Sequence, residues 1–207
     1  MRVAAFVRAF LVLLILVAAI GGLIVYFIAR RGLSARVEPT RVEAFIARSM
    51  RRMATPSAVR AMTNPVQPTE AVFAEGLEHF ADHCATCHAN NGSGDTEIGR
   101  RLYPRAPDMR TASTQELSDG ELFSIIENGI RLTGMAGWAT GTPEGERASW
   151  VLVHFLRRLP ALTDDEISRM EALNPRTADE WRQDEAARRF LAGEDDASPP
   201  AAPTHQH

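Results

Sequence analysis

The sequence predicts an all-α domain preceded by one long apolar helix, and three observations support this fold class. Apolar residues recur at helical spacing in several segments after residue 40. Serine or threonine precedes several of these segments at the position where a side chain caps a helix. Strand-like alternation of apolar and polar residues is missing from the region between residues 69 and 160. We therefore expect one compact helical domain with an N-terminal anchor and C-terminal extensions.

The N-terminal anchor is predicted within residues 1–30. Residues 9–29 form an uncharged, apolar run, and a helix of about 20 apolar residues spans the ~30 Å hydrocarbon core of a bilayer. A cleaved signal peptide is the alternative, since residues 17–19 are small enough for a cleavage site. The run continues well past Ala19, however, whereas the apolar region of a signal peptide usually has about 7–15 residues. An uncleaved single-pass signal-anchor is therefore favoured.

Residues 31–68 are predicted to be a linker that contains an amphipathic helix. Residues 41–53 place apolar side chains on one helical face and arginines on the other. Two interpretations stand side by side: a helix on the membrane surface, with arginines near lipid headgroups, or a docking or spacer helix. Prolines at positions 56, 65 and 68 end the pattern and mark the linker.

The compact domain is predicted at residues 69–160 and contains three main helices. Thr69 caps the first helix, which leads to a pair of cysteines. Ser118 and Glu121 form a capping box for the second helix, which ends at Gly129. The third helix begins near residues 142–143, with proline in its first turn, and is closed by Pro160.

Residues 161–192 are predicted to be a helical extension, because capping boxes begin at Thr163 and Thr177. Residues 193–207 are acidic and then rich in proline, a composition typical of a disordered tail.

Charge is unevenly distributed along a chain whose formal net charge is only −3, a balance that argues against nucleic acid as the main partner. The chain contains no lysine. Residues 2–60 hold 10 arginines against two acids, Glu38 and Glu43. Residues 70–160 hold 13 acids against 8 arginines. If charge steers encounters, the face of a partner that meets this domain should therefore be basic.

The only two cysteines form the motif Cys84-Ala85-Thr86-Cys87-His88, the attachment pattern of a c-type haem. On a helical turn both thiols lie on one side, so they can reach the two vinyl groups of one porphyrin, and His88 then lies under the iron. A thioredoxin-like pair would need alternating strands and helices, and a zinc site would need further ligands. A non-haem metal module using the cysteines with His205 and His207 is a weaker alternative.

A haem bound through His88 has a sixth coordination position, for which Met135 is the favoured ligand. Met135 lies in a glycine-flanked loop between two capped helices, and such a loop can bring a thioether to the open face of a haem. The other candidates for this position are Met109, Met170, His79, His83 and His154.

Residues 69–160 resemble the class I cytochrome c family, whose small fold packs around one haem with histidine and methionine ligands. The resemblance rests on the attachment motif, residues 102–108, residues 117–123, Gly134-Met135 and the closing aromatic helix. It covers less than half of the chain. It implies one covalent haem c on Cys84 and Cys87, with His88 and Met135 as axial ligands.

The same resemblance implies three packing residues and further contacts to the haem. Gly76, Phe80 and Phe155 match the glycine and aromatics that cross in this family. The carbonyl of Pro107, with Pro104 as the alternative, would orient the His88 ring.

Three further side chains are candidates for the haem pocket, namely Tyr103, Arg105 and Trp138. Their donor groups suit the haem propionates. The alternatives are plain packing for the two aromatics and a solvated charge for Arg105.

These features predict an electron-transfer protein rather than an enzyme: a membrane-tethered cytochrome that passes single electrons between respiratory-chain partners, with no small-molecule substrate. A haem-based peroxidase or gas sensor with an open sixth site is the alternative.

The expected location is the bacterial inner membrane with the haem domain in the periplasm. Arginines are more frequent after the apolar run than before it, which by itself favours the opposite orientation. Haem attachment requires export, and we give it precedence.

Overall fold

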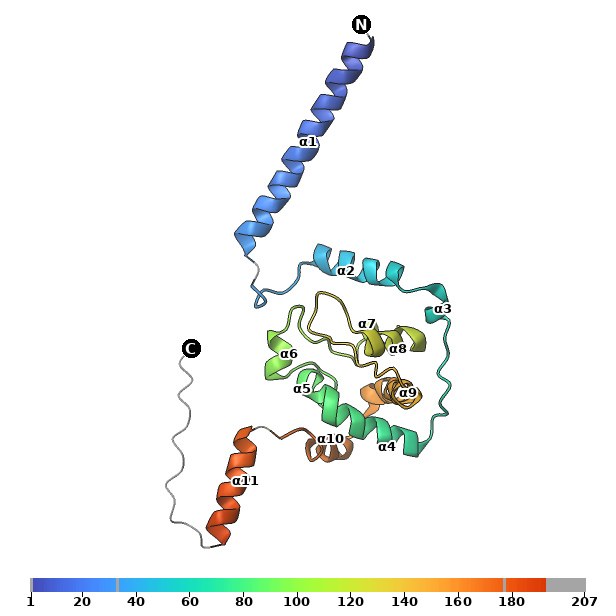
Figure 1. The fold of residues 1–207 in the computed structure, drawn as a ribbon, viewed down its shortest axis with the longest axis vertical. Coiled ribbons are helices and arrows are strands. Elements are labelled where there is room, and N and C mark those ends of the chain that lie inside the picture. The colour runs from blue at the N-terminus through green and yellow to red at the C-terminus, as the bar shows by residue number, and fades with distance from the viewer. Residues whose placement is uncertain (1, 33, 177, 193–207) are drawn as a thin grey trace.

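The computed structural model describes residues 2–32, 34–176 and 178–192, and these residues contain helices but no strands (Figure 1). The predicted tail at residues 193–207 lies outside the described residues. The all-α class is thus confirmed. The helices are α1 (Arg2–Arg31), α2 (Arg41–Ala54), α3 (Ser57–Arg60), α4 (Glu70–His79), α5 (Ala85–His88), α6 (Glu97–Arg101), α7 (Ala112–Gln115), α8 (Asp119–Asn128), α9 (Pro143–Arg158), α10 (Asp164–Glu171) and α11 (Ala178–Leu191), with a π-helical segment, η1 (Phe80–Cys84), and a 3-10 turn, η2 (Leu159–Ala161).

Helix α1 projects away from the helical domain, as Figure 1 shows. Its segment Ala4–Arg30 is long and apolar enough to cross a membrane, and none of that segment is buried against the rest of the chain. An apolar helix without a protein partner matches the composition and length of a bilayer-spanning anchor.

The core lies where α4 crosses α9, and a glycine permits the close approach. A Cβ atom at Gly76 would lie only 2.9 Å from the Cβ of Phe155 and 3.1 Å from the Val151 carbonyl oxygen. Phe155 is fully buried, and its ring lies 4.8 Å from that of Phe80 and 5.8 Å from that of Phe73. The structure therefore brings together the glycine and the two aromatics that the resemblance implied.

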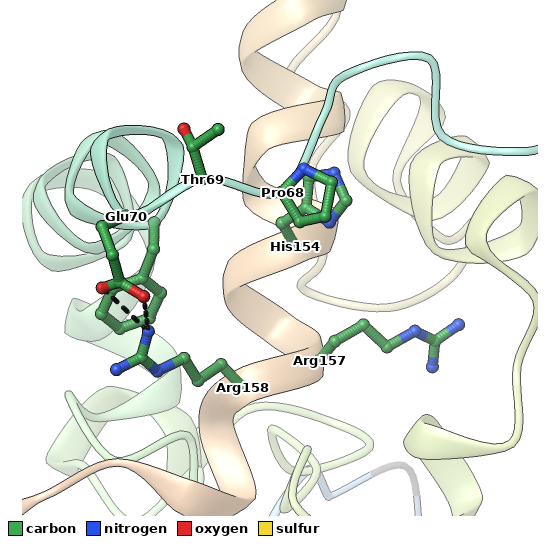
Figure 2. Close-up of a pocket in the computed structure, with 7 residues that line it drawn as sticks. Pro68, Thr69, Glu70, His154, Arg157 and Arg158 are labelled. Atoms are coloured by element: carbon green, nitrogen blue, oxygen red, sulfur yellow. Dashed lines mark hydrogen bonds and ion pairs between the residues drawn. The ribbon is translucent and has the colours of Figure 1, made fainter.

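One edge of this crossing is closed by charged side chains from α9 (Figure 2). The Arg158 guanidinium lies 3.7 Å from the centroid of the Phe73 ring and pairs with Glu70 at 3.2 Å and with Glu166 at 3.0 Å. These contacts border a shallow cavity of about 290 Å³. Because Arg158 is already paired there, we interpret the cavity as a packing edge rather than a binding site.

The linker wraps around the domain and is fixed to it by polar contacts. The Asn64 amide donates to the Trp150 carbonyl at 2.8 Å, and His154 Nε2 donates to the Val66 carbonyl at 2.7 Å. Helix α3 packs so closely on α8 that a Cβ at Gly120 would lie 1.8 Å from the Val59 carbonyl oxygen. The linker is therefore an integral part of the folded domain rather than a loose tether.

Helix α10 extends the core beyond the predicted domain boundary. Met170 is completely buried and belongs to the same apolar cluster as Phe155. Thr163 and Glu166 form the expected capping box at its start. Helix α11 follows, and near its end Phe190 and Leu191 are largely exposed.

Candidate haem site

The attachment motif lies at the end of the first helix of the domain, where the helical geometry changes. Helix α4 passes into the π-helical segment η1, which ends at Cys84, and α5 then carries Cys87 and His88. Isolated π-helical turns inside α-helices are frequent at functional sites. Ala89 ends the turn with a φ of 59°, a left-handed conformation that is uncommon for alanine.

Both cysteines are unpaired and partly buried. Burial, with a smaller contribution from nearby Cys87, raises the pKa of the Cys84 thiol to about 12. Burial thus favours the protonated form of this thiol in the chain by itself. Among the described residues no group of three or more His, Cys, Asp or Glu side chains is arranged to hold a metal ion. The weaker alternative, a metal module with His205 and His207, involves residues outside the described part of the chain.

His88 is a buried imidazole. Its Nδ1 is buried and makes no hydrogen bond within the part of the chain that the structure describes. Burial also lowers the pKa of the ring, which favours the neutral form that binds iron. A buried polar atom without a partner costs about 1–3 kcal/mol. The neutral, buried ring next to two thiols fits a haem, because that group supplies both a metal for the imidazole and vinyl carbons for the thiols.

The loop after the motif supports the attachment turn at very short range. A Cβ at Gly99 in α6 would lie 2.3 Å from the Cys87 carbonyl oxygen and 2.5 Å from that of Gly94. Thr96 caps α6 and donates through Oγ1 to the same Cys87 carbonyl at 3.2 Å. The His88 carbonyl in turn accepts from the Gly94 amide at 2.8 Å.

We expect Gly99→Ala to disrupt this support, because its Cβ would overlap two backbone oxygens that cannot move independently. The expected result is a lower yield of haem-loaded protein and a lower unfolding midpoint, measured by Soret absorbance per chain and by thermal unfolding. Gly22→Ala in α1 is the matched control, since nothing lies within 4 Å of its Cβ position. An equal haem yield in both variants would contradict the role of Gly99.

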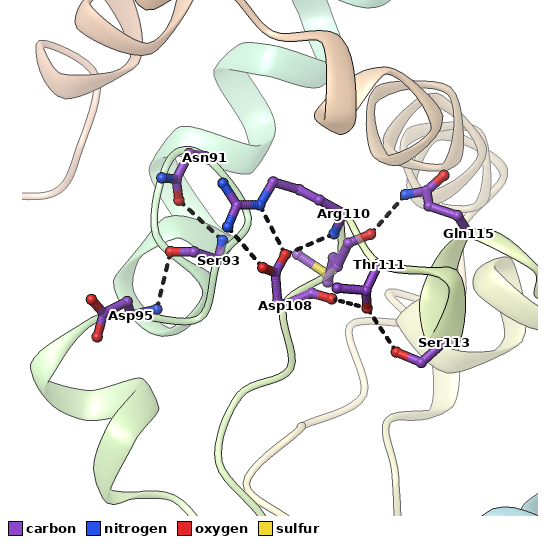
Figure 3. Close-up of polar contacts among 9 residues, drawn as sticks. Asn91, Ser93, Asp95, Asp108, Arg110, Thr111, Ser113 and Gln115 are labelled. Atoms are coloured by element: carbon purple, nitrogen blue, oxygen red, sulfur yellow. Dashed lines mark hydrogen bonds and ion pairs between the residues drawn. The ribbon is translucent and has the colours of Figure 1, made fainter.

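A polar network anchors the same loop to the core (Figure 3). The Met109 amide donates to the Gly92 carbonyl at 2.8 Å. The Gln115 amide donates to the carbonyls of Met109 at 2.7 Å and Leu156 at 2.9 Å, and so joins the loop to α9. Arg110 pairs with Asp108 at 2.7 Å and lowers the pKa of that carboxyl by its side-chain hydrogen bonds.

Met135 lies in a tight loop between α8 and α9 that is closed by backbone contacts. The Ile130 amide donates to the Met135 carbonyl at 3.0 Å, and the Met135 amide donates to Thr133 Oγ1 at 3.1 Å. Gly129, with a φ of 65°, leaves the space that this turn requires, because a Cβ there would lie 2.5 Å from the Met135 carbonyl oxygen. Met135 itself is half-buried.

Two residues that flank Met135 in this loop, Gly134 and Trp138, contact residues close to the attachment motif. A Cβ at Gly134 would lie 2.6 Å from the Leu102 side chain, which follows α6. On the other side of Met135, the centroid of the Trp138 ring lies 5.6 Å from that of the His83 ring, edge to face. Helix α6 in turn supports Cys87. The loop with Met135 is therefore connected on two sides to the elements that carry the motif.

Tyr103 and Arg105, the candidate donors to haem propionates, have protein partners instead. Tyr103 donates a hydrogen bond to Glu43 at the start of α2, and Arg105 pairs with Glu38 at 3.2 Å. Pro107 is exposed, and its carbonyl receives no hydrogen bond from His88 Nδ1. Their roles toward the haem remain predictions.

The other candidate axial ligands lie in the apolar core, against the linker, or beside a separate hollow. Met109 and Met170 are buried in the apolar core, and His154 is bonded to the linker. The rings of His79 and His83 lie 4.9 Å apart, and burial, followed by the charge of His83, lowers the pKa of His79. These two rings border a hollow of about 490 Å³, which is not lined by Cys84, Cys87, His88 or Met135.

Sequence reasoning missed the two contacts made by Glu38 and Glu43. Their isolation in the sequence could have indicated a specific role, since they are the only acids in residues 2–60, beside 10 arginines. It also missed Gly99, because α6 has only five residues and no recognisable periodicity.

Comparison with known families matches the same region of the chain. Residues 71–156 match the family model described as cytochrome C oxidase, cbb3-type, subunit III. The match begins in α4, includes the attachment motif and the Met135 loop, and ends in α9. This region is therefore a class I c-type cytochrome domain, an electron-transfer module that binds one covalent haem c.

Proposed function

We propose that this protein is a membrane-tethered carrier of single electrons whose haem is bound by Cys84, Cys87 and His88. The observation that carries the proposal is the buried His88 ring, which follows Cys87 directly on the turn that bears both thiols and whose pKa is lowered by burial, so that it is neutral and can bind iron. Bound haem supplies an iron that alternates between the ferric and ferrous states. The chain contributes two thioether links and one neutral imidazole, which hold the iron in a fixed position.

Met135 is the proposed second axial ligand. The support is its half-buried position in a closed loop that contacts both sides of the motif. A thioether ligand raises the reduction potential. With both axial positions filled by side chains, no site is left for a substrate, and electron transfer is the remaining chemistry.

Helix α1 is the proposed tether, with the haem domain in the periplasm. The support is its length, its apolar composition and its lack of burial against the domain. The matching family model is named for a subunit of a cbb3-type oxidase, and we propose that this chain likewise serves a membrane oxidase, as a subunit or as its electron donor. Anchoring confines the domain near membrane partners and raises its effective concentration there.

The first experiment is the visible and near-infrared spectrum of the purified full chain, oxidised and reduced. A low-spin haem with a sulfur-to-iron charge-transfer band supports the electron carrier. A high-spin haem whose reduced form binds carbon monoxide would instead indicate an open sixth site, as in a peroxidase or gas sensor.

Met135→Leu tests the axial ligand without creating a cavity, because leucine has nearly the same volume. We expect loss of the sulfur-to-iron band, a lower reduction potential and new carbon monoxide binding, read by redox titration and difference spectra. The matched control is Met53→Leu, at a largely exposed position in α2. A variant at position 135 that keeps the band would exclude this methionine as ligand.

A further inference from the structure

We propose that α2 lies in the surface of the bilayer that α1 spans, with its apolar face at the boundary between headgroups and acyl chains. The inference rests on the proposed tether. It assigns a second membrane contact to this chain, and it places the loop with Tyr103 and Arg105 next to the membrane surface.

One face of α2 is apolar and lacks a partner within the folded chain. Its five apolar side chains recur at helical spacing, and each has at least half of its surface exposed: Val42 68%, Phe45 66%, Ile46 50%, Met50 60% and Met53 78%. The helix contains no buried residue. Soluble surfaces rarely expose contiguous apolar patches of this kind without a binding role.

The opposite face of α2 points to the haem domain. Ala44, Ser49 and Arg51 are partly buried, and Ala44 and Arg51 lie on the far side of the helix from the five apolar residues. At the N-terminal end Glu43 accepts a hydrogen bond from Tyr103, and Glu38 pairs with Arg105 at 3.2 Å. The Glu43 contact therefore ties the start of α2 to a loop of the domain, while its five apolar side chains stay largely exposed.

The bilayer is the occupant that the position of α2 favours. Helix α1 ends at Arg31 and α2 begins at Arg41, so the connecting chain is short and keeps the start of α2 within about 35 Å of the end of α1. Figure 1 shows α2 between α1 and the loops of the domain. A helix so close to the membrane, with an unpartnered apolar face, has lipid as its nearest apolar phase.

The arginines of α2 complement anionic headgroups. Arg41, Arg48 and Arg52 are exposed and lie beside the apolar face. This is the distribution of an interfacial helix, whose basic residues reach headgroups while apolar ones enter the acyl region. It also accounts for the excess of arginine after the apolar run.

The test uses the full haem-loaded chain in vesicles of phosphatidylethanolamine and phosphatidylglycerol. Single cysteines are introduced as Ile46→Cys, Ala47→Cys and Leu14→Cys and are spin-labelled. Label depth is then measured by power saturation with oxygen and a nickel chelate. The native cysteines are thioethers in the mature protein, and the parent chain serves as the control for background labelling.

We expect the label at position 46 to be accessible to oxygen and shielded from nickel, and the label at position 47 to show the reverse. Position 14 should be the deepest. If positions 46 and 47 are equally exposed to nickel while position 14 is deep, the surface helix is wrong but the tether stands. If position 14 is also in water, the tether itself fails. Spin–spin coupling at position 46 would show that a second copy covers the face, which overturns the lipid assignment.

Discussion

Replacing both cysteines by serine abolishes covalent haem attachment, the largest functional effect that we expect in this chain. Serine has a hydroxyl in place of each thiol and forms no thioether with a vinyl group. Haem then remains extractable with acidified acetone, whereas it stays with the polypeptide in the parent protein. The measurement is haem staining of the denatured chain together with the pyridine haemochrome spectrum.

Single substitutions provide the matched control. Cys84→Ser and Cys87→Ser should each keep one thioether, and the haemochrome maximum should shift because one vinyl group stays unsaturated. Haem that remains bound after extraction in the double variant would contradict attachment through this motif. A chain that binds zinc and shows no haem spectrum would restore the metal-module alternative.

Phe155→Ala has the largest expected effect on stability. Phe155 is fully buried and lies against Phe73, Phe80 and the backbone at Gly76. Removing a buried phenylalanine ring lowers the free energy of unfolding by about 3–5 kcal/mol. This is a large part of the total free energy of unfolding, which is about 5–15 kcal/mol for a typical domain. The measurement is guanidinium unfolding of the haem-loaded chain in detergent, followed by Soret absorbance and circular dichroism.

Phe190→Ala is the control for this prediction. Phe190 lies on α11 and has 67% of its surface exposed, so its removal should change the free energy of unfolding by less than about 0.5 kcal/mol. Equal unfolding midpoints for the two variants would show that the crossing of α4 and α9 does not carry the stability of the domain.

The sequence was sufficient to predict features that depend on residues close to one another along the chain. The motif at residues 84–88 has fixed spacing, and the capping boxes at Ser118 and Thr163 are confirmed as helix starts. The helix expected at residues 41–53 is observed as Arg41–Ala54. Each of these features depends on residues within a few positions of one another, which is the range over which helical hydrogen bonds and side-chain caps act.

By itself, then, the sequence determined the all-α class, the long apolar helix at the N-terminus and the spacing of the Cys84–His88 motif. Only the tertiary structure decided how distant segments meet: that Glu38 and Glu43 bind the loop with Arg105 and Tyr103, that Gly99 supports Cys87, and which face of α2 stays exposed. The physical reason is that a side chain's partner across a fold depends on how helices pack, and periodicity specifies a face but not what that face meets.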